Sequence, residues 1–287
     1  MVVEKQYVNV ELNYFKMKYL SILLIALLSA FQTDNLYNII KVNGQIINTS
    51  TGKSLSAGDK VRPNDQLQFD SRLSSALAIS SSRGKFSLKV PEGSDAFSDS
   101  KLLAVADNAV SPIKSRNQLS TRSIGNGLVK DLKSYFGADE FTIVGNTLNL
   151  KLDPDIYPLN ENNFIVFSYM QDGKQVTKKI GFTDQQIKIE KDKLLVNVTD
   201  PHLVGVIVYQ YNKTSNSPVE ITKFNLNFVE ADNLMKEFKA VVDVLNGMKL
   251  QKEDKTKYLT DYFVDIYGQT DQSQLSQLVN QSLVADK

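Results

Sequence analysis

Residues 164–180, F-I-V-F-S-Y-M-Q-D-G-K-Q-V-T-K-K-I, contain the strongest hairpin signal in the chain. Two runs rich in β-branched and aromatic residues flank Asp172-Gly173, a dipeptide that readily adopts the left-handed backbone of a tight two-residue turn. The stretch therefore predicts two antiparallel strands, Phe164–Met170 and Gln175–Ile180. It also indicates that the central part of the chain is built from β-strands.

Further short strands with frequent turns surround this hairpin. The pattern predicts them at 141–144, 147–152, 187–189, 194–198, 204–211 and 221–228, after a short helix from Gly127 to Phe136 that Gly137 ends. About seven strands with such turns favour an immunoglobulin-like β-sandwich for residues 123–230. The chain contains neither cysteine nor tryptophan, so the prediction concerns architecture and not the Cys–Trp core of antibody domains.

Residues 38–91 show a second region of short strands. Apolar residues alternate with polar ones, and turn residues such as Asn43-Gly44, Gly58-Asp59 and Asn64-Asp65 interrupt them at short intervals. This period of two predicts a small all-β sandwich, barrel or solenoid.

The turns and apolar positions of this region form a recognisable set: Val42-x-Gly44-x-Ile46, Leu55-x-x-Gly58-Asp59-x-Val61, Asn64-Asp65-x-Leu67 and Ser75-Ala76-Leu77. The set resembles the FecR-type domain, a periplasmic β module of bacteria. The resemblance implies an extracytoplasmic interaction module without catalysis. Sensors of this family carry a cytoplasmic anti-sigma segment before a membrane helix, whereas only 16 residues precede the apolar run here, so we do not expect sigma-factor regulation.

Residues 18–32, K-Y-L-S-I-L-L-I-A-L-L-S-A-F-Q, have the composition of an export signal. Lys16 and Lys18 form a basic flank, and Ser29-Ala30 places small residues near the end. A membrane-spanning helix needs about 20 apolar residues, which is longer than this run. We therefore predict a signal peptide over 1–32, with a true start at Met17, and a periplasmic or extracellular protein without a stable membrane span after cleavage. The alternatives are a retained membrane anchor and a buried core helix.

Two other regions complete the predicted organisation. Residues 92–122 are rich in Ser, Asp and Asn and predict an exposed linker with at most a short helix or strand. In residues 231–287 the apolar period changes to that of helices, which predicts about three amphipathic helices: one ended by Gly247, one ended by Gly268 and one capped by Asp271. These helices either complete the fold or dock a partner protein. The predicted fold class is thus mainly β with a helical C-terminus.

Composition excludes several classes of function. The 33 Lys and Arg nearly balance the 32 Asp and Glu, so no global field attracts nucleic acid. Zero cysteines exclude disulfides, thiol nucleophiles and cysteine-ligated zinc. No phosphate-binding glycine loop or nucleophile elbow occurs, and Gly125-Asn126-Gly127 is too short to cradle a phosphate.

Few side chains are candidates for chemistry. His202 is the only histidine and lies in the turn-like Asp200-Pro201-His202. Asp139-Glu140 and Asp153-Pro154-Asp155 are adjacent carboxylates, but spacing alone does not place them across a cleft or around calcium. We therefore predict that the protein is not an enzyme, that it uses no cofactor and that it has no catalytic, cofactor-binding or metal-binding residues.

Tyrosine is plentiful, and Tyr209 and Tyr211 share one face of a predicted strand, where they either pack or form a binding platform. Together with the export signal and the FecR resemblance, this favours an exported bacterial envelope protein that works by binding a protein partner. The alternative is a module that binds glycan or peptidoglycan. A divergent hydrolase is a third hypothesis, and the single histidine disfavours it.

Overall fold

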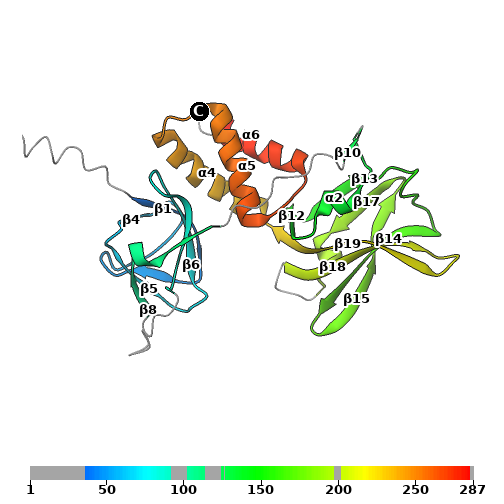
Figure 1. The fold of residues 1–287 in the computed structure, drawn as a ribbon, viewed down its shortest axis with the longest axis horizontal. Coiled ribbons are helices and arrows are strands. Elements are labelled where there is room, and N and C mark those ends of the chain that lie inside the picture. Colours follow the sequence, from blue (N-terminus) through cyan, green and yellow to red (C-terminus); the bar gives the residue numbers. More distant parts are fainter. Residues whose placement is uncertain (1–35, 92–101, 114–123, 126, 197–201, 285–287) are drawn as a thin grey trace, which may run out of the picture. The chain divides into compact units, whose positions relative to one another are not determined.

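The computed structural model describes residues 36–91, 102–113, 124–125, 127–196 and 202–284. Its first strands, coloured blue to cyan in Figure 1, form two small sheets. One sheet has the order β4-β1-β6-β7-β9 and the other β3-β2-β5-β8. The strands are β1 (Tyr37–Asn43), β2 (Ile46–Asn48), β3 (Lys53–Ser54), β4 (Lys60–Val61), β5 (Gln66–Phe69), β6 (Ser75–Ser80), β7 (Gly84–Lys89), β8 (Leu102–Val105) and β9 (Val110–Pro112).

The two sheets share one apolar core that includes Ile39, Leu67, Phe69 and Phe86. Gly44 makes the turn from β1 to β2 with φ +72°, and a Cβ on it would lie 2.5 Å from the Ser74 hydroxyl oxygen. Strands β8 and β9, with the 3₁₀ turn η1 (Ala106–Ala109), lie inside the predicted linker 92–122. They pair with β5 and β7, so the module extends to Pro112 because the apolar run at 102–105 completes a sheet.

The central strands form a five-stranded sheet, β12-β19-β18-β14-β15, and a three-stranded sheet, β13-β17-β16. Strand β12 pairs parallel to β19, and the other pairs are antiparallel. Asp172 and Gly173 both have positive φ in the turn between β14 and β15, which confirms the predicted hairpin. The strands are β12 (Glu140–Val144), β13 (Thr147–Lys151), β14 (Asn163–Gln171), β15 (Lys174–Lys179), β16 (Gly181–Thr183), β17 (Gln186–Glu190), β18 (His202–Asn212) and β19 (Ser217–Val229).

The two central sheets bury their facing side chains in one core. Ile165 and Phe167 of the larger sheet and Leu150 and Ile189 of the smaller sheet belong to it. Helix α2 (Leu132–Phe136) adds Phe136, whose ring stacks on Phe224 at 4.6 Å. Asp131 caps this helix by accepting a hydrogen bond from the Ser134 amide.

Two local predictions for this region are wrong. The helix expected from Gly127 begins only at Leu132, because Leu128–Val129 form strand β11, which pairs with β10 (Ile124–Gly125). A strand was also expected at 194–198, but Leu194 is the last residue of helix α3 (Lys191–Leu194). The Leu194 carbonyl accepts a hydrogen bond from the buried Tyr169 hydroxyl, which holds this turn against the core, and residues 197 and 198 lie outside the described residues.

The C-terminal part forms α4 (Ala231–Gly247), α5 (Lys252–Tyr267) and α6 (Gln272–Val284). Asp271 accepts a hydrogen bond from the Gln274 amide, as the predicted cap requires. The apolar faces of the helices share a core with Ile40 of β1, Ile79 of β6 and Val144 of β12. Because these faces are buried within the protein, the helices complete the fold.

Buried polar contacts join these helices to β1 and β7. The Lys41 ammonium lies 3.0 Å from Glu237, which also accepts hydrogen bonds from the Tyr262 and Tyr267 hydroxyls. Lys85 lies 2.5 Å from Asp265. Burial raises the pKa of Tyr262 and that of Tyr267 well above the ordinary value, so both hydroxyls stay protonated and donate.

The structure confirms a mainly β fold with a helical C-terminus. Within the ranges given above, no helix is long and apolar enough to cross a membrane. The predicted signal peptide, residues 1–32, lies outside the described residues, and its cleavage stays a prediction.

Candidate functional site

Strand β14 contributes apolar side chains to both faces of the five-stranded sheet. Ile165, Phe167 and Tyr169 point to the core between the two sheets. Because side chains alternate along a strand, Phe164 and Val166 lie on the opposite, outer face. The packing of the two sheets against each other does not explain an apolar residue on the face away from their core.

The register with β18 assembles these side chains into a strip. Phe164 lies opposite Tyr211, and Val166 lies opposite Tyr209. Ile207 follows two positions before Tyr209 on the same strand, and residues directly opposite one another share a face. We name Phe164, Val166, Ile207, Tyr209 and Tyr211 the outer strip.

The outer strip is only partly covered. Val166 is buried, with 7% exposure, and the other four side chains are half-buried. Among the described residues, the three apolar cores contain none of the five. The strip is therefore an apolar surface that the described part of the fold leaves open to a ligand.

Ring contacts organise one end of the strip. The Phe164 and Tyr211 rings lie 5.2 Å apart at an angle of 33°. The Lys179 ammonium of the neighbouring strand β15 lies 4.1 Å from the centre of the Phe164 ring, a cation–π arrangement. Within the described residues the Tyr209 hydroxyl has no hydrogen-bond partner, so the strip offers both apolar area and a free polar group.

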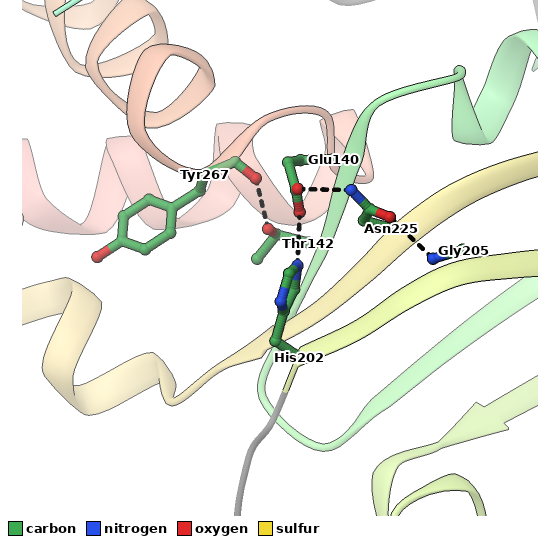
Figure 2. A network of polar contacts seen from close by, with 6 residues as sticks. All are labelled: Glu140, Thr142, His202, Gly205, Asn225 and Tyr267. Carbon is green, nitrogen blue, oxygen red and sulfur yellow. Dashed lines mark hydrogen bonds and ion pairs between the residues drawn. The ribbon is translucent and has the colours of Figure 1, made fainter. Parts of the chain in front are cut away.

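His202 and Glu140 lie at a different place on the same sheet, in a network of strand ends (Figure 2). His202 Nε2 lies 3.2 Å from one Glu140 oxygen, and Asn225 Nδ2 donates to the other at 2.9 Å. The Asn225 carbonyl oxygen in turn accepts a hydrogen bond from the Gly205 amide. These contacts tie the ends of β12, β18 and β19 together, which is a structural task.

The same strand ends are attached to helix α5. The Thr142 hydroxyl donates to the Tyr267 carbonyl at 2.6 Å, and Gln269 forms backbone hydrogen bonds with Glu140 and Thr142. Gly268 has φ +80°, and a Cβ there would lie 2.4 Å from the Glu140 carbonyl oxygen. Only glycine fits this close approach, so the chain after α5 pairs with the free edge of β12.

Of the other carboxylates that the sequence singled out, that of Asp153 has a local role. Asp153 accepts a hydrogen bond from the Asp155 amide at 3.0 Å and lies 3.7 Å from the Lys130 ammonium. The Asp139 carbonyl accepts from the Asn225 amide. Over the described ranges, no group of three or more His, Asp or Glu side chains is placed to hold a metal ion.

The four tyrosines noted in the sequence divide between core and surface. Tyr157 accepts a hydrogen bond from the Leu132 amide at 3.1 Å, and Tyr169 donates to Leu194, so both are structural. Burial raises the pKa of both hydroxyls. Tyr209 and Tyr211 lie on the outer strip instead. Sequence periodicity places them on one face, but it does not show that this face is the open one.

Neither a scan of the sequence against protein-family models nor a search of curated proteins finds a match.

Proposed function

We propose that the chain is an exported bacterial envelope protein that binds a protein partner through the outer strip and performs no catalysis. The observation that carries this proposal is the open apolar face of the five-stranded sheet. Aromatic residues are enriched at protein interfaces because they bury large areas and their polar ends can still form hydrogen bonds. The strip combines three such rings with the aliphatic side chains of Val166 and Ile207.

The strand order supports the finer, immunoglobulin-like assignment. In such sandwiches strands G, F and C are neighbours in one sheet, and B, E and D in the other. The order β19-β18-β14 in one sheet and β13-β17-β16 in the other corresponds to this scheme. Strand β12 then takes the place of A beside G, and β15 is an added strand beside C. Sandwiches of this kind are frequent in cell-surface proteins, although the fold alone implies no function.

Export is supported by the apolar stretch 18–32 and by the FecR-like turns of residues 38–91. N-terminal sequencing of the mature protein tests it. A mature start near Phe31 to Thr33 is expected after signal cleavage. An intact Met1 or Met17 would contradict the proposal.

The alternative function is binding of glycan or peptidoglycan, which half-exposed tyrosine rings can support by stacking on sugars. Two features favour a protein partner instead. The Lys179 ammonium lies over the Phe164 ring, and the Phe164 and Tyr211 rings are inclined to one another.

Site-specific photo-crosslinking tests the protein partner. A benzoylphenylalanine at position 209, in place of Tyr209, should give one discrete adduct in the native envelope. The same group in place of Leu73, which is 90% exposed on the N-terminal module, serves as the control. The partner protein found in this adduct is then purified on its own, and its binding to the intact mature chain is measured.

We expect the double variant Tyr209→Ala/Tyr211→Ala to bind that partner about tenfold more weakly or worse, as for aromatic interface residues, while Leu73→Ala binds as wild type. Equal affinity of the double variant and wild type would refute the proposal. Specific binding on a glycan array that this double variant loses, with no protein adduct, would replace it with the alternative function.

A further inference from the structure

A cleft of about 400 Å³ opens beside the edge strand β15, away from the strand ends of Figure 2. Strands β15, β16 and β17 and helix α3 form its walls. Leu194 and Val196 contribute apolar surface to it. Its volume falls in the range of small-molecule sites, which is about 300–1,000 Å³. The charged residues that line it are Lys178, Lys179, Lys188, Lys193, Glu190 and Asp192.

Positive charge dominates the lining, because four ammonium groups face two carboxylates. One of these carboxylates is already shared between two lysines. Lys188 Nζ lies 2.8 Å from one Glu190 oxygen, and Lys193 contacts the other. Hydrogen bonds from Lys188 and then Lys193 hold the pKa of Glu190 below its usual value, so this carboxylate stays ionised.

Two of the lysines lack a counter-charge. Within the described residues, neither Lys178 nor Lys179 forms an ion pair. Lys178 lies opposite Phe167, so it stands on the core side of the edge strand and is half-buried. The Lys179 ammonium is positioned by the rings of Phe164 and Phe182, 4.1 and 5.4 Å from their centres. Positioned ammonium groups without a carboxylate attract an external anion.

We propose that this cleft binds a tetrahedral oxyanion, a phosphate or sulfate group carried on a small polar molecule of the size of a monosaccharide. The Lys178 and Lys193 ammonium groups would donate charge-assisted hydrogen bonds to the oxygens of the anion, whereas Lys179 points to the opposite face of the strand and adds only to the local positive charge. Val196, which is exposed, would contact the carbon skeleton of its carrier. The cleft and the outer strip are separate places on the protein, because Lys179 is the only residue at both. An anion site in the cleft is therefore a function beyond the proposed binding of a protein partner.

The intact mature chain is titrated with glucose 6-phosphate, glucose 6-sulfate and glucose at low salt, and binding is followed by the amide NMR signal of Gly181 in the cleft wall. We expect both anionic sugars to shift this signal and glucose not to. The two anionic arms distinguish a phosphate from a sulfate ligand. Addition of salt should weaken binding, since exposed charges are screened.

Three variants test whether affinity for the anionic sugar falls, rises or stays the same as the proposal predicts. Lys178→Gln should weaken binding of the preferred anionic sugar about fivefold or more, because a charge-assisted contact is lost. Asp192→Asn should tighten binding severalfold, because a like charge is removed. The matched control is Lys174→Gln, which changes the same charge on the same strand but lies outside the cleft lining. It should leave affinity within about twofold.

Three results would overturn the proposal. They are an unchanged Gly181 signal at saturating anionic sugar, equal binding of glucose, and a loss with Lys174→Gln as large as that with Lys178→Gln. Thermal unfolding of each variant verifies that it is folded. Partner binding through the outer strip is measured separately with Tyr209→Ala/Tyr211→Ala, so failure of one site does not imply failure of the other.

Discussion

Both faces of the five-stranded sheet carry apolar side chains, but only those of the inner face form a closed core, whereas the outer strip lies among polar residues such as Lys179 and Lys223. On the inner face Phe141, Phe167 and Phe224 pack ring to ring with Phe136 of helix α2, with centres 4.6–6.2 Å apart. On the outer face Val166 is buried, and the other four side chains of the outer strip are only half-buried. The same strand β14 supplies both faces from alternate positions. The comparison teaches that the inner set stabilises the fold, whereas the outer set is available for binding.

The largest effect is expected from truncating one ring on each face of β14. Phe167→Ala should lower the free energy of unfolding by about 3–5 kcal/mol, because it leaves a cavity in a closed core. Phe164→Ala, on the open face, should cost about 1 kcal/mol or less, because water and neighbouring side chains fill the space. Denaturant midpoints of the two variants measure this. Similar midpoint shifts would break the distinction between the faces.

The end of the sheet at which the chain after α5 pairs with the edge of β12 gives the next prediction. Gly268→Ala should destabilise the protein by roughly 2–3 kcal/mol, because the new Cβ meets the Glu140 carbonyl and the backbone is left-handed. Gly52→Ala is the matched control, with φ +72° but no atom within 4 Å of the added Cβ. A loss at Gly268 no greater than at Gly52 would mean that the chain after α5 does not pair closely with the edge of β12.

Helix α2, which covers the inner face, depends on its cap. Asp131→Ala should cost about 1 kcal/mol, since the Ser134 amide loses its acceptor, whereas Asp131→Asn should cost less. The Ser134 hydroxyl hydrogen bond lowers the pKa of Asp131 in the folded state. The ionised Asp131 carboxylate therefore contributes to the free energy of unfolding at pH values above its pKa in the unfolded chain. This contribution is lost as the pH falls through its lower pKa in the folded protein.

Comparing wild type with Asp131→Asn in denaturant unfolding between neutral and acidic pH tests the sign. The difference in stability between them should shrink on acidification. A difference that grows as pH falls would contradict this account of the cap.

The smallest effect on stability is expected from the outer strip itself. Tyr209→Ala should change the free energy of unfolding by about 1 kcal/mol or less, as for a partly exposed side chain outside the core. Its effect should be on partner binding instead. A loss of several kcal/mol, measured by the same denaturant unfolding, would assign Tyr209 to the fold and not to a binding surface.

Sequence periodicity predicted where the strands lie more reliably than which of their faces is buried. The alternation in residues 164–170 predicts β14, but Ile165 and Phe167 are as apolar as Phe164 and Val166. Which set is buried depends on where the sheet β13-β17-β16 packs, and that is a long-range contact. The same applies to the C-terminal helices. Their apolar faces could be predicted from the sequence, but the burial of these faces against Ile40 and Ile79 could not.

Other features lacked a local signal. Strands β8 and β9 are short, lie between polar segments and are stabilised by pairing with strands that precede them in sequence. The cleft lysines come from separate runs, so their convergence depends on the register of β15 with β14 and on the position of α3. Asp271 and the Asp172-Gly173 turn were predicted correctly because caps and tight turns are decided by neighbouring residues.

The central claim, that the outer strip is a partner-binding surface, can be measured directly because the chain contains no cysteine. Single Tyr209→Cys and Leu73→Cys variants are labelled with a maleimide, first as purified protein and then in the native envelope. Both should react when purified, and in the envelope the thiol at position 209 should be protected while that at position 73 still reacts. Equal labelling of both thiols in the envelope would contradict the claim.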